Sequence, residues 1–135
     1  MYRNVLVPIA FDDDDKVDAS LQAARALGEA DGRVTLLHVV EHVPAYAVQY
    51  VPDDLVKATL EGIHAELDRL AAMVPGGEGV VVEGHSGRTI LDYAREHAND
   101  CIIVASHRPE MQDYLLGSTA AQVVRHADCT VVVIR

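Results

Sequence analysis

The sequence has no tryptophan and a single phenylalanine, although half of its 135 residues are hydrophobic. Valine, isoleucine, leucine and alanine therefore make up most of the hydrophobic residues. An aliphatic composition of this kind is typical of buried parallel strands that helices cover. A chain of this length usually forms one domain and can bury a core without disulfides or a metal. We therefore expect one domain over residues 1–135.

Cysteine is also scarce, and no long hydrophobic run is present. Cys101 and Cys129 are the two cysteines, and neither belongs to a CxxC motif or a Cys/His cluster. This usage indicates a reducing compartment. The apolar stretch after Met1 is too short for a signal peptide, and no apolar run reaches the roughly 18 residues that cross a bilayer. The sequence thus predicts a soluble cytoplasmic protein that does not enter a membrane.

Positive charge is the third scarce property. Lys and Arg total 11 against 21 Asp and Glu, which gives a formal net charge of -10. Proteins that bind nucleic acids need clustered Lys and Arg to displace counterions from the phosphates. The composition therefore argues against a nucleic-acid partner and leaves small molecules and basic proteins as partners.

Short aliphatic runs alternate with segments of helical spacing along the whole chain. The runs predict strands at 5–9, 34–40, 80–83, 101–105 and 130–134. The helical segments cover about 14–30, 53–74, 86–98 and 117–127, and the second of them has an apolar stripe that runs from Leu55 to Val74. This alternation requires right-handed crossovers and a parallel sheet with helices on both faces, so we predict a doubly wound, Rossmann-like α/β domain. Ligands of such domains bind beyond the carboxyl ends of the strands, where the winding reverses.

The loop after the fourth predicted strand leads into the last predicted helix with the sequence "ASHRPEMQDYLLGST" at 105–119. The first turn of a helix has free N–H groups and the positive end of the dipole, which together bind anions such as phosphate. Gly117 would let a ligand approach the backbone, and Ser118 and Thr119 would add hydroxyl donors. Alternatively, Ser118 or Thr119 is only the N-cap of the helix, a reading that spacing alone favours.

Five segments in chain order resemble the universal stress protein A family, and the resemblance covers the whole chain. They are "VLVPIA", "VTLLHVV", "IIVASHRP", "YLLGST" and "VVRHADCTVVVIR", and they are most similar to the F/G-type branch. The resemblance implies a five-stranded sheet of order 3-2-1-4-5, nucleotide binding in many members, and dimers formed through the last strand. An edge strand of β-prone residues can pair with its twin. We therefore expect a homodimer through residues 130–134, with a higher oligomer as an alternative.

The ATP-binding members of that family carry the pattern GxxG, nine residues, and then Gly followed by Ser or Thr. Here Ala105 and Arg108 occupy the two glycine positions, and eight residues separate Arg108 from Gly117. Alanine adds only a methyl group, whereas an arginine guanidinium suits phosphate oxygens. We expect Arg108, Ser118 and Thr119 to hold the phosphates, with His107 assisting. The alternative for Arg108 is a surface ion pair with a neighbouring carboxylate.

The resemblance also implies an apolar slot for adenine at the ends of the first two strands and the fourth. Ala10 stands where the family usually has an aspartate that would hydrogen-bond the base or ribose region. The nucleotide site predicted in this way comprises Pro8, Ile9, Ala10, Val39, Val104, Ala105, Ser106, His107, Arg108, Gly117, Ser118 and Thr119.

Four consecutive aspartates at 12–15 follow the first strand. Carboxylates bind Mg²⁺ only when they converge, and consecutive residues of a helix point in different directions. We interpret the run as a cap on the first helix. Asp12, near the phosphates through Mg²⁺, is the weaker alternative, and we predict no other metal site.

The sequence has no GxSxG and no Walker GxxxxGK motif, and no Ser/His/Asp arrangement was found in it. We predict a universal stress protein that binds ATP, with or without Mg²⁺, as a regulatory or sensing ligand. Any hydrolysis or autophosphorylation would be slow, because no general base or arginine finger is evident. The alternative is a dimeric stress-response interaction protein of the same fold that does not bind nucleotide.

Overall fold

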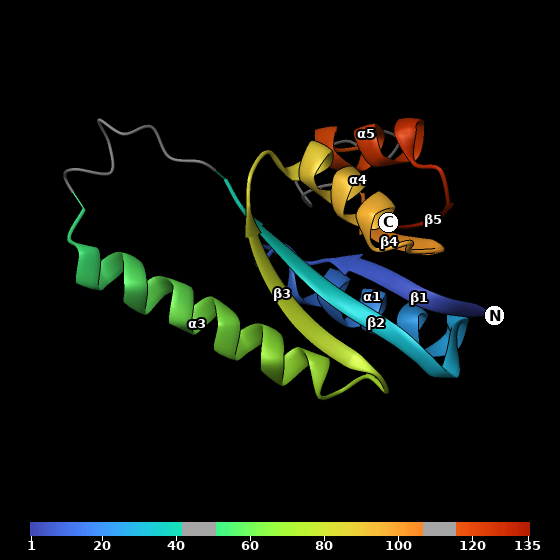
Figure 1. The fold of residues 1–135 in the computed structure, drawn as a ribbon, viewed down its shortest axis with the longest axis horizontal. Helices are drawn as coiled ribbons and strands as arrows, with labels where there is room; N and C mark the ends of the chain where they lie inside the picture. The colour runs from blue at the N-terminus through green and yellow to red at the C-terminus, as the bar shows by residue number, and fades with distance from the viewer. Residues whose placement is uncertain (42–50, 107–115) are drawn as a thin grey trace.

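The computed structural model describes residues 1–41, 51–106 and 116–135. Strands and helices alternate along the chain (Figure 1). In order they are β1 (Tyr2–Pro8), α1 (Asp14–Leu27), β2 (Gly28–Val40), α3 (Asp53–Ala71), β3 (Gly77–Glu83), α4 (Ser86–Glu96), β4 (Cys101–Ala105), α5 (Ser118–His126) and β5 (Thr130–Ile134). None of the helices in these ranges is long and apolar enough to span a membrane.

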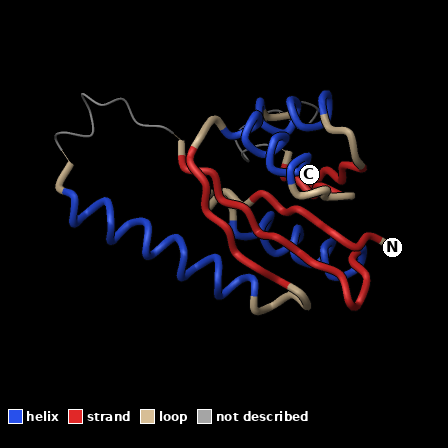
Figure 2. The backbone as a smooth tube through the Cα atoms, viewed as in Figure 1, coloured by secondary structure: helices blue, strands red, loops and turns tan. Residues whose placement is uncertain are grey.

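The five strands form one parallel sheet in the order β3-β2-β1-β4-β5, as predicted. Figure 2 shows the long strands β2 and β3 running side by side. The winding reverses between β1 and β4, which pair through Val5 with Cys101 and Leu6 with Ile102. This reversal is the point at which doubly wound domains hold their ligands.

Helices bury both faces of the sheet. Val5 and Val7 pack in a core with α1 and α3, whereas Leu6 packs in a second core with α4 and α5. Leu36 and Leu37 are neighbours on β2 that belong to opposite cores, and both are fully buried. The aliphatic runs are continuous rather than alternating because both faces of these strands are covered.

The aspartate run caps α1, as interpreted from the sequence. The Asp13 carboxylate accepts hydrogen bonds from the N–H groups of Asp15 at 3.1 Å and Lys16 at 3.3 Å. Asp14 and Asp15 lie in the first turn, where their charge favours the positive end of the helix dipole.

Three strands begin earlier than predicted, because backbone pairing extends past the aliphatic runs: β1 begins at Tyr2 rather than at 5, and β2 and β3 are extended as well. Gly28 ends α1 in an extended conformation and pairs with Tyr2, so β2 begins there rather than at 34 and α1 ends at 27 rather than 30. Gly77 pairs with Val34, so β3 begins at 77 rather than 80. The preceding Gly76 has a φ of 73°, and a Cβ there would collide with the Gly32 carbonyl oxygen. Glycine is therefore required at this turn.

Only the carboxyl-terminal part of α3 packs on the sheet. The apolar spacing predicted one buried stripe from Leu55 to Val74, and Leu67 and Leu70 are indeed buried. Leu55, however, is 57% exposed, which contradicts the prediction for that end. Figure 1 shows the amino-terminal half of α3 lying away from the sheet. Helical spacing shows which residues of a helix share one apolar face, but it does not show where the strand that would cover this face ends.

The two cysteines lie in different cores. Cys101 is fully buried in the core that faces α1 and α3, whereas Cys129 packs against the core that faces α4 and α5. Both are free thiols. Burial, with smaller effects from Cys129 and Asp100, raises the pKa of the Cys101 thiol to about 11 from its ordinary value of 9.0.

This shift predicts a loss of stability at alkaline pH. The folded protein keeps the Cys101 proton up to pH of about 11, whereas the unfolded chain releases it near pH 9. The stabilisation is therefore complete below pH 9 and decreases as the pH rises from 9 to 11. In urea denaturation between these pH values, Cys101→Ala should lose stability less steeply than the wild type. Equal slopes for the two proteins would contradict the shift.

Candidate functional site

A cleft of about 600 Å³ opens at the carboxyl ends of β1, β2 and β4. Pro8 and Ile9 line it from the end of β1, and Val104 and Ala105 line it from β4. It therefore lies where the winding reverses, and we name it the switch-point cleft. Its lining residues are Pro8, Ile9, Ala10, Asp12, Lys16, Leu37, His38, Val39, Glu41, Ser86, Ile90, Val104, Ala105, Ser106, Gly117, Ser118, Thr119 and Ala120.

The structure brings the predicted site residues that it describes to this one cleft. They lie at or just after the ends of β1, β2 and β4, or at the start of α5: Pro8, Ile9, Ala10, Val39, Val104, Ala105, Ser106, Gly117, Ser118 and Thr119. Asp12, the alternative Mg²⁺ ligand, also lines the cleft. His107 and Arg108 lie outside the described residues.

Ser106 lines the cleft and forms three hydrogen bonds to other segments of the chain. Its N–H donates to the Ile134 carbonyl at 2.8 Å, and its own carbonyl accepts from the Gly117 N–H at 2.6 Å. Its hydroxyl accepts from the Lys16 ammonium at 3.1 Å. Ser106 is only 1% exposed, so these bonds form with little competition from water. One residue thus joins the end of β4 to β5, to the start of α5 and to α1.

The amino-terminal end of α5 carries no side-chain cap. Gly117 is the N-cap residue, with φ -63° and ψ 162°, so the interpretation of Ser118 or Thr119 as the cap is wrong. No acidic residue lies in the first turn of this helix, which is within the described residues. The first turn of α1, by contrast, is capped by Asp13 and carries two more carboxylates. Among the described residues, no side chain caps or neutralises the positive end of the α5 dipole, which faces the cleft and suits an anion.

Polar groups also line the cleft at the end of β2. The His38 Nδ1 donates to the Ile9 carbonyl at 2.8 Å, and the Phe11 ring lies against the imidazole with centroids 4.9 Å apart. The Ser86 hydroxyl donates to the Glu41 carboxylate at 3.0 Å. Ser86 is the first residue of α4, and His85 rather than Ser86 is the N-cap residue of that helix.

Sequence reasoning missed several lining residues, namely Lys16, His38, Glu41 and Ser86. Their position was a signal that could have identified them: His38 lies near the carboxyl end of β2, Glu41 follows that strand, and Lys16 and Ser86 lie in the first turns of α1 and α4. Asp12 is near them, but in the described parts of the chain no three His, Cys, Asp or Glu side chains gather around a potential metal position.

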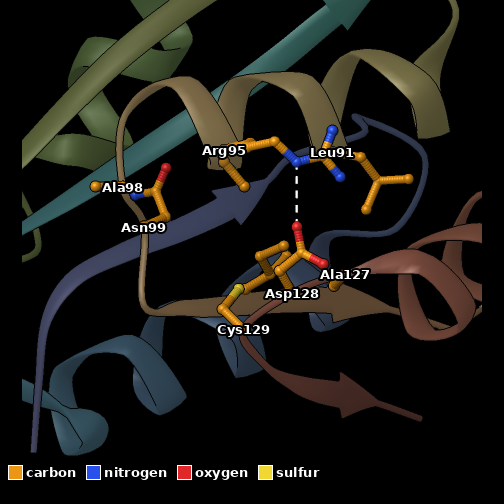
Figure 3. A pocket seen from close by; sticks show the side chains of 9 residues that line it. Leu91, Arg95, Ala98, Asn99, Ala127, Asp128 and Cys129 are labelled. Carbon is orange, nitrogen blue, oxygen red and sulfur yellow. Dashed lines mark hydrogen bonds and ion pairs between the residues drawn. The ribbon is translucent and has the colours of Figure 1, made fainter.

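A second pocket of about 210 Å³ lies at the other end of β4 and β5 (Figure 3). Arg95 Nε donates to the Asp128 carboxylate across 3.1 Å at this pocket. Leu91 and Cys129 also line it, and burial, with smaller effects from two nearby aspartates, raises the pKa of the Cys129 thiol. A thiol that keeps its proton is a poor nucleophile. The Asn99 side-chain oxygen is buried here without a hydrogen bond and out of reach of solvent. The switch-point cleft is the better candidate site.

The sheet order and the position of the cleft place the protein in the class of Rossmann-like α/β domains. Comparison with known sequences then gives the family. The profile of the universal stress protein family matches residues 1–135, and the chain belongs to that family.

Individual relatives agree over their whole length. The chain is 28% identical to universal stress protein G of Escherichia coli O157:H7, covering all of both proteins. Among solved structures, the universal stress protein UspA from Lactobacillus plantarum is 26% identical, with a TM-score of 0.74 and 99% and 98% of the two chains covered.

Two further solved structures are described as nucleotide complexes. A universal stress protein in complex with cAMP is 20% identical, with a TM-score of 0.69 over 99% of this chain and 97% of the other. The universal stress protein from Archaeoglobus fulgidus in complex with dAMP is 17% identical, with a TM-score of 0.63 over 99% and 98%. At these identities the two structures share the fold.

Proposed function

We propose that the switch-point cleft binds an adenine nucleotide as a regulatory or sensing ligand in the stress response. The observation that carries the proposal is the uncapped start of α5, which lies at the cleft beside Ser106 and Lys16. Free N–H groups at a helix start bind phosphate. The complexes of two relatives with cAMP and dAMP support the proposal, because both ligands combine adenine with a phosphate.

The lining suggests how the nucleotide lies. Apolar side chains at the strand ends, including Ile9 and Val39, suit the adenine ring. Gly117, Ser118 and Thr119 suit the phosphates, with Arg108 and His107 proposed as further phosphate ligands. We propose ATP as the nucleotide, with Mg²⁺ near Asp12 as an option. Its role is regulatory, and any hydrolysis is slow.

We also propose that the protein is a homodimer that pairs through β5. This strand is an edge of the sheet, and its middle residues are only partly buried in the single chain. An unprotected edge of β-prone residues can take another strand. Light scattering at micromolar concentration is expected to give the mass of two chains or more, and the mass of one chain would reject the dimer. Cytoplasmic residence and the lack of a nucleic-acid partner stay predictions from composition.

The nucleotide proposal is tested on the protein as purified. Denaturation should release a nucleotide that chromatography identifies, and calorimetry with stripped protein should detect binding of ATP, AMP or cAMP. Uridine nucleotides serve as the control for base preference. No released nucleotide and no heat with millimolar adenine nucleotide would reject the proposal. That outcome would favour the interaction protein without nucleotide, a function consistent with the alanine and arginine at the glycine positions of the motif.

A further inference from the structure

Lys16 is a charged residue of the cleft that the family pattern does not explain. It lies in the first turn of α1, and its ammonium group donates to the Ser106 hydroxyl at 3.1 Å, across 90 positions of sequence. We propose that Lys16 binds the phosphate of the ligand and so makes the cleft select nucleotides over nucleosides. This inference rests on the proposed function and adds a specificity-determining residue to it.

The charges around the cleft support this role. Among the described lining residues, Asp12 and Glu41 are acidic, and Lys16 is the one lysine or arginine. Two carboxylates repel a phosphate, so an anionic ligand needs a position where positive charge outweighs them. Lys16 together with the start of α5 provides such a position.

The hydrogen-bond geometry brings these two positive groups to one place. The Gly117 N–H at the start of α5 donates to the carbonyl of Ser106, and the Lys16 ammonium is bonded to the hydroxyl of the same residue. Ser106 is buried and fixed by the hydrogen bond of its N–H to Ile134. A phosphate at the α5 start therefore lies next to the Lys16 ammonium, where a charge-assisted hydrogen bond is strong.

A purely structural role for Lys16 makes a different prediction. If the lysine only held Ser106 in place, its loss would disturb the whole cleft and lower the affinity for nucleosides and for nucleotides to the same extent. If the ammonium binds phosphate, its loss lowers the affinity for the phosphorylated ligands only. Adenosine, AMP and ATP thus separate the two roles, because the three share the base and the ribose.

The experiment is calorimetric titration of adenosine, AMP and ATP into the wild type, Lys16→Gln, Lys16→Arg and Lys57→Gln. Lys57 is exposed on α3 and lies outside the cleft lining, so it controls for the general loss of one charge. Lys16→Gln should weaken AMP and ATP by about tenfold to a hundredfold, as expected for a hydrogen bond to a charged group. Adenosine should change by less than about twofold on the same scale. Lys16→Arg should keep most of the nucleotide affinity, and Lys57→Gln all of it.

Each contrary result has a distinct meaning. Nucleotide affinity unchanged in Lys16→Gln overturns the role of Lys16 and leaves the proposed function standing. Equal weakening of adenosine and AMP also overturns it, in favour of a structural role. If the wild type binds none of the three ligands, the proposed function fails and this inference fails with it. A thermal melt of each variant without ligand verifies folding, and Lys16→Met, which also removes the charge, replaces the glutamine variant if that variant is unstable.

Discussion

Gly117→Asp is expected to lower the affinity for AMP and ATP by about a hundredfold or more, while the protein stays as stable as the wild type or becomes slightly more stable. Gly117 has the extended backbone of an N-cap residue, so an aspartate there can accept hydrogen bonds from the first-turn N–H groups of α5. Capping and the helix dipole together favour the folded state by about 0.5–1 kcal/mol. The same carboxylate occupies the proposed phosphate position and repels the ligand, and the loss of two charge-assisted hydrogen bonds accounts for the size of the effect.

Gly117→Asn is the matched control for this experiment. Asparagine caps a helix about as well as aspartate but carries no charge. The loss of AMP affinity in Gly117→Asn measures the contribution of side-chain bulk and helix capping. The further loss of AMP affinity in Gly117→Asp measures the contribution of the charge. Thermal melts, titrations and light scattering of both variants complete the comparison. Unimpaired AMP binding by the aspartate variant would place the phosphate away from α5.

Leu67→Ala is expected to destabilise the fold by about 2–5 kcal/mol, whereas Leu55→Ala on the same helix should cost less than about 0.5 kcal/mol. Leu67 is fully buried against the sheet, and its truncation leaves a cavity. Leu55 is 57% exposed at the end of α3 that lies beyond the sheet. Both residues belong to the same apolar stripe in the sequence.

Urea denaturation of the two variants measures these losses of stability. The two values can be compared directly, because the same chemical change is made at two positions of one helix. Helix propensity contributes little to the difference, since alanine replaces leucine in both. Similar costs at the two positions would show that the amino-terminal half of α3 is packed in solution. Nucleotide binding should be unaffected by Leu55→Ala, because that residue does not line the cleft.

The periodicity of the sequence was sufficient to predict which elements form, but their boundaries depended on pairing with other strands. Continuous aliphatic runs predicted the buried strands because both faces are covered by helices. The starts of β2 and β3 contain glycines and polar residues, so they have no apolar pattern. They belong to the sheet because their backbones pair with Tyr2 and Val34 of the neighbouring strands. The exposed half of α3 was mispredicted for a related reason, since burial depends on what lies opposite a stripe.

The candidate site was predictable where residues follow strands or match the family motif. Ser106, Gly117 and the strand-end residues were identified in this way. Lys16 was missed because its contact with Ser106 depends on how α1 is placed beside the end of β4, which local spacing does not contain. The cap of α5 was misassigned because serine and threonine are preferred at N-caps, yet glycine also serves, and here the helix begins one residue after it.

The hydrogen bond between the Ser106 N–H and the Ile134 carbonyl has a thermodynamic consequence. Ile134 is the last residue of β5, and Ser106 lines the switch-point cleft. A ligand that shifted Ser106 would act on the end of β5 through this bond, and a chain that paired with β5 would act on Ser106 through the same bond. Such coupling is reciprocal: the factor by which one event favours the other is the same in both directions. If the proposed nucleotide and the proposed second chain bind as inferred above, each would change the affinity for the other by this common factor.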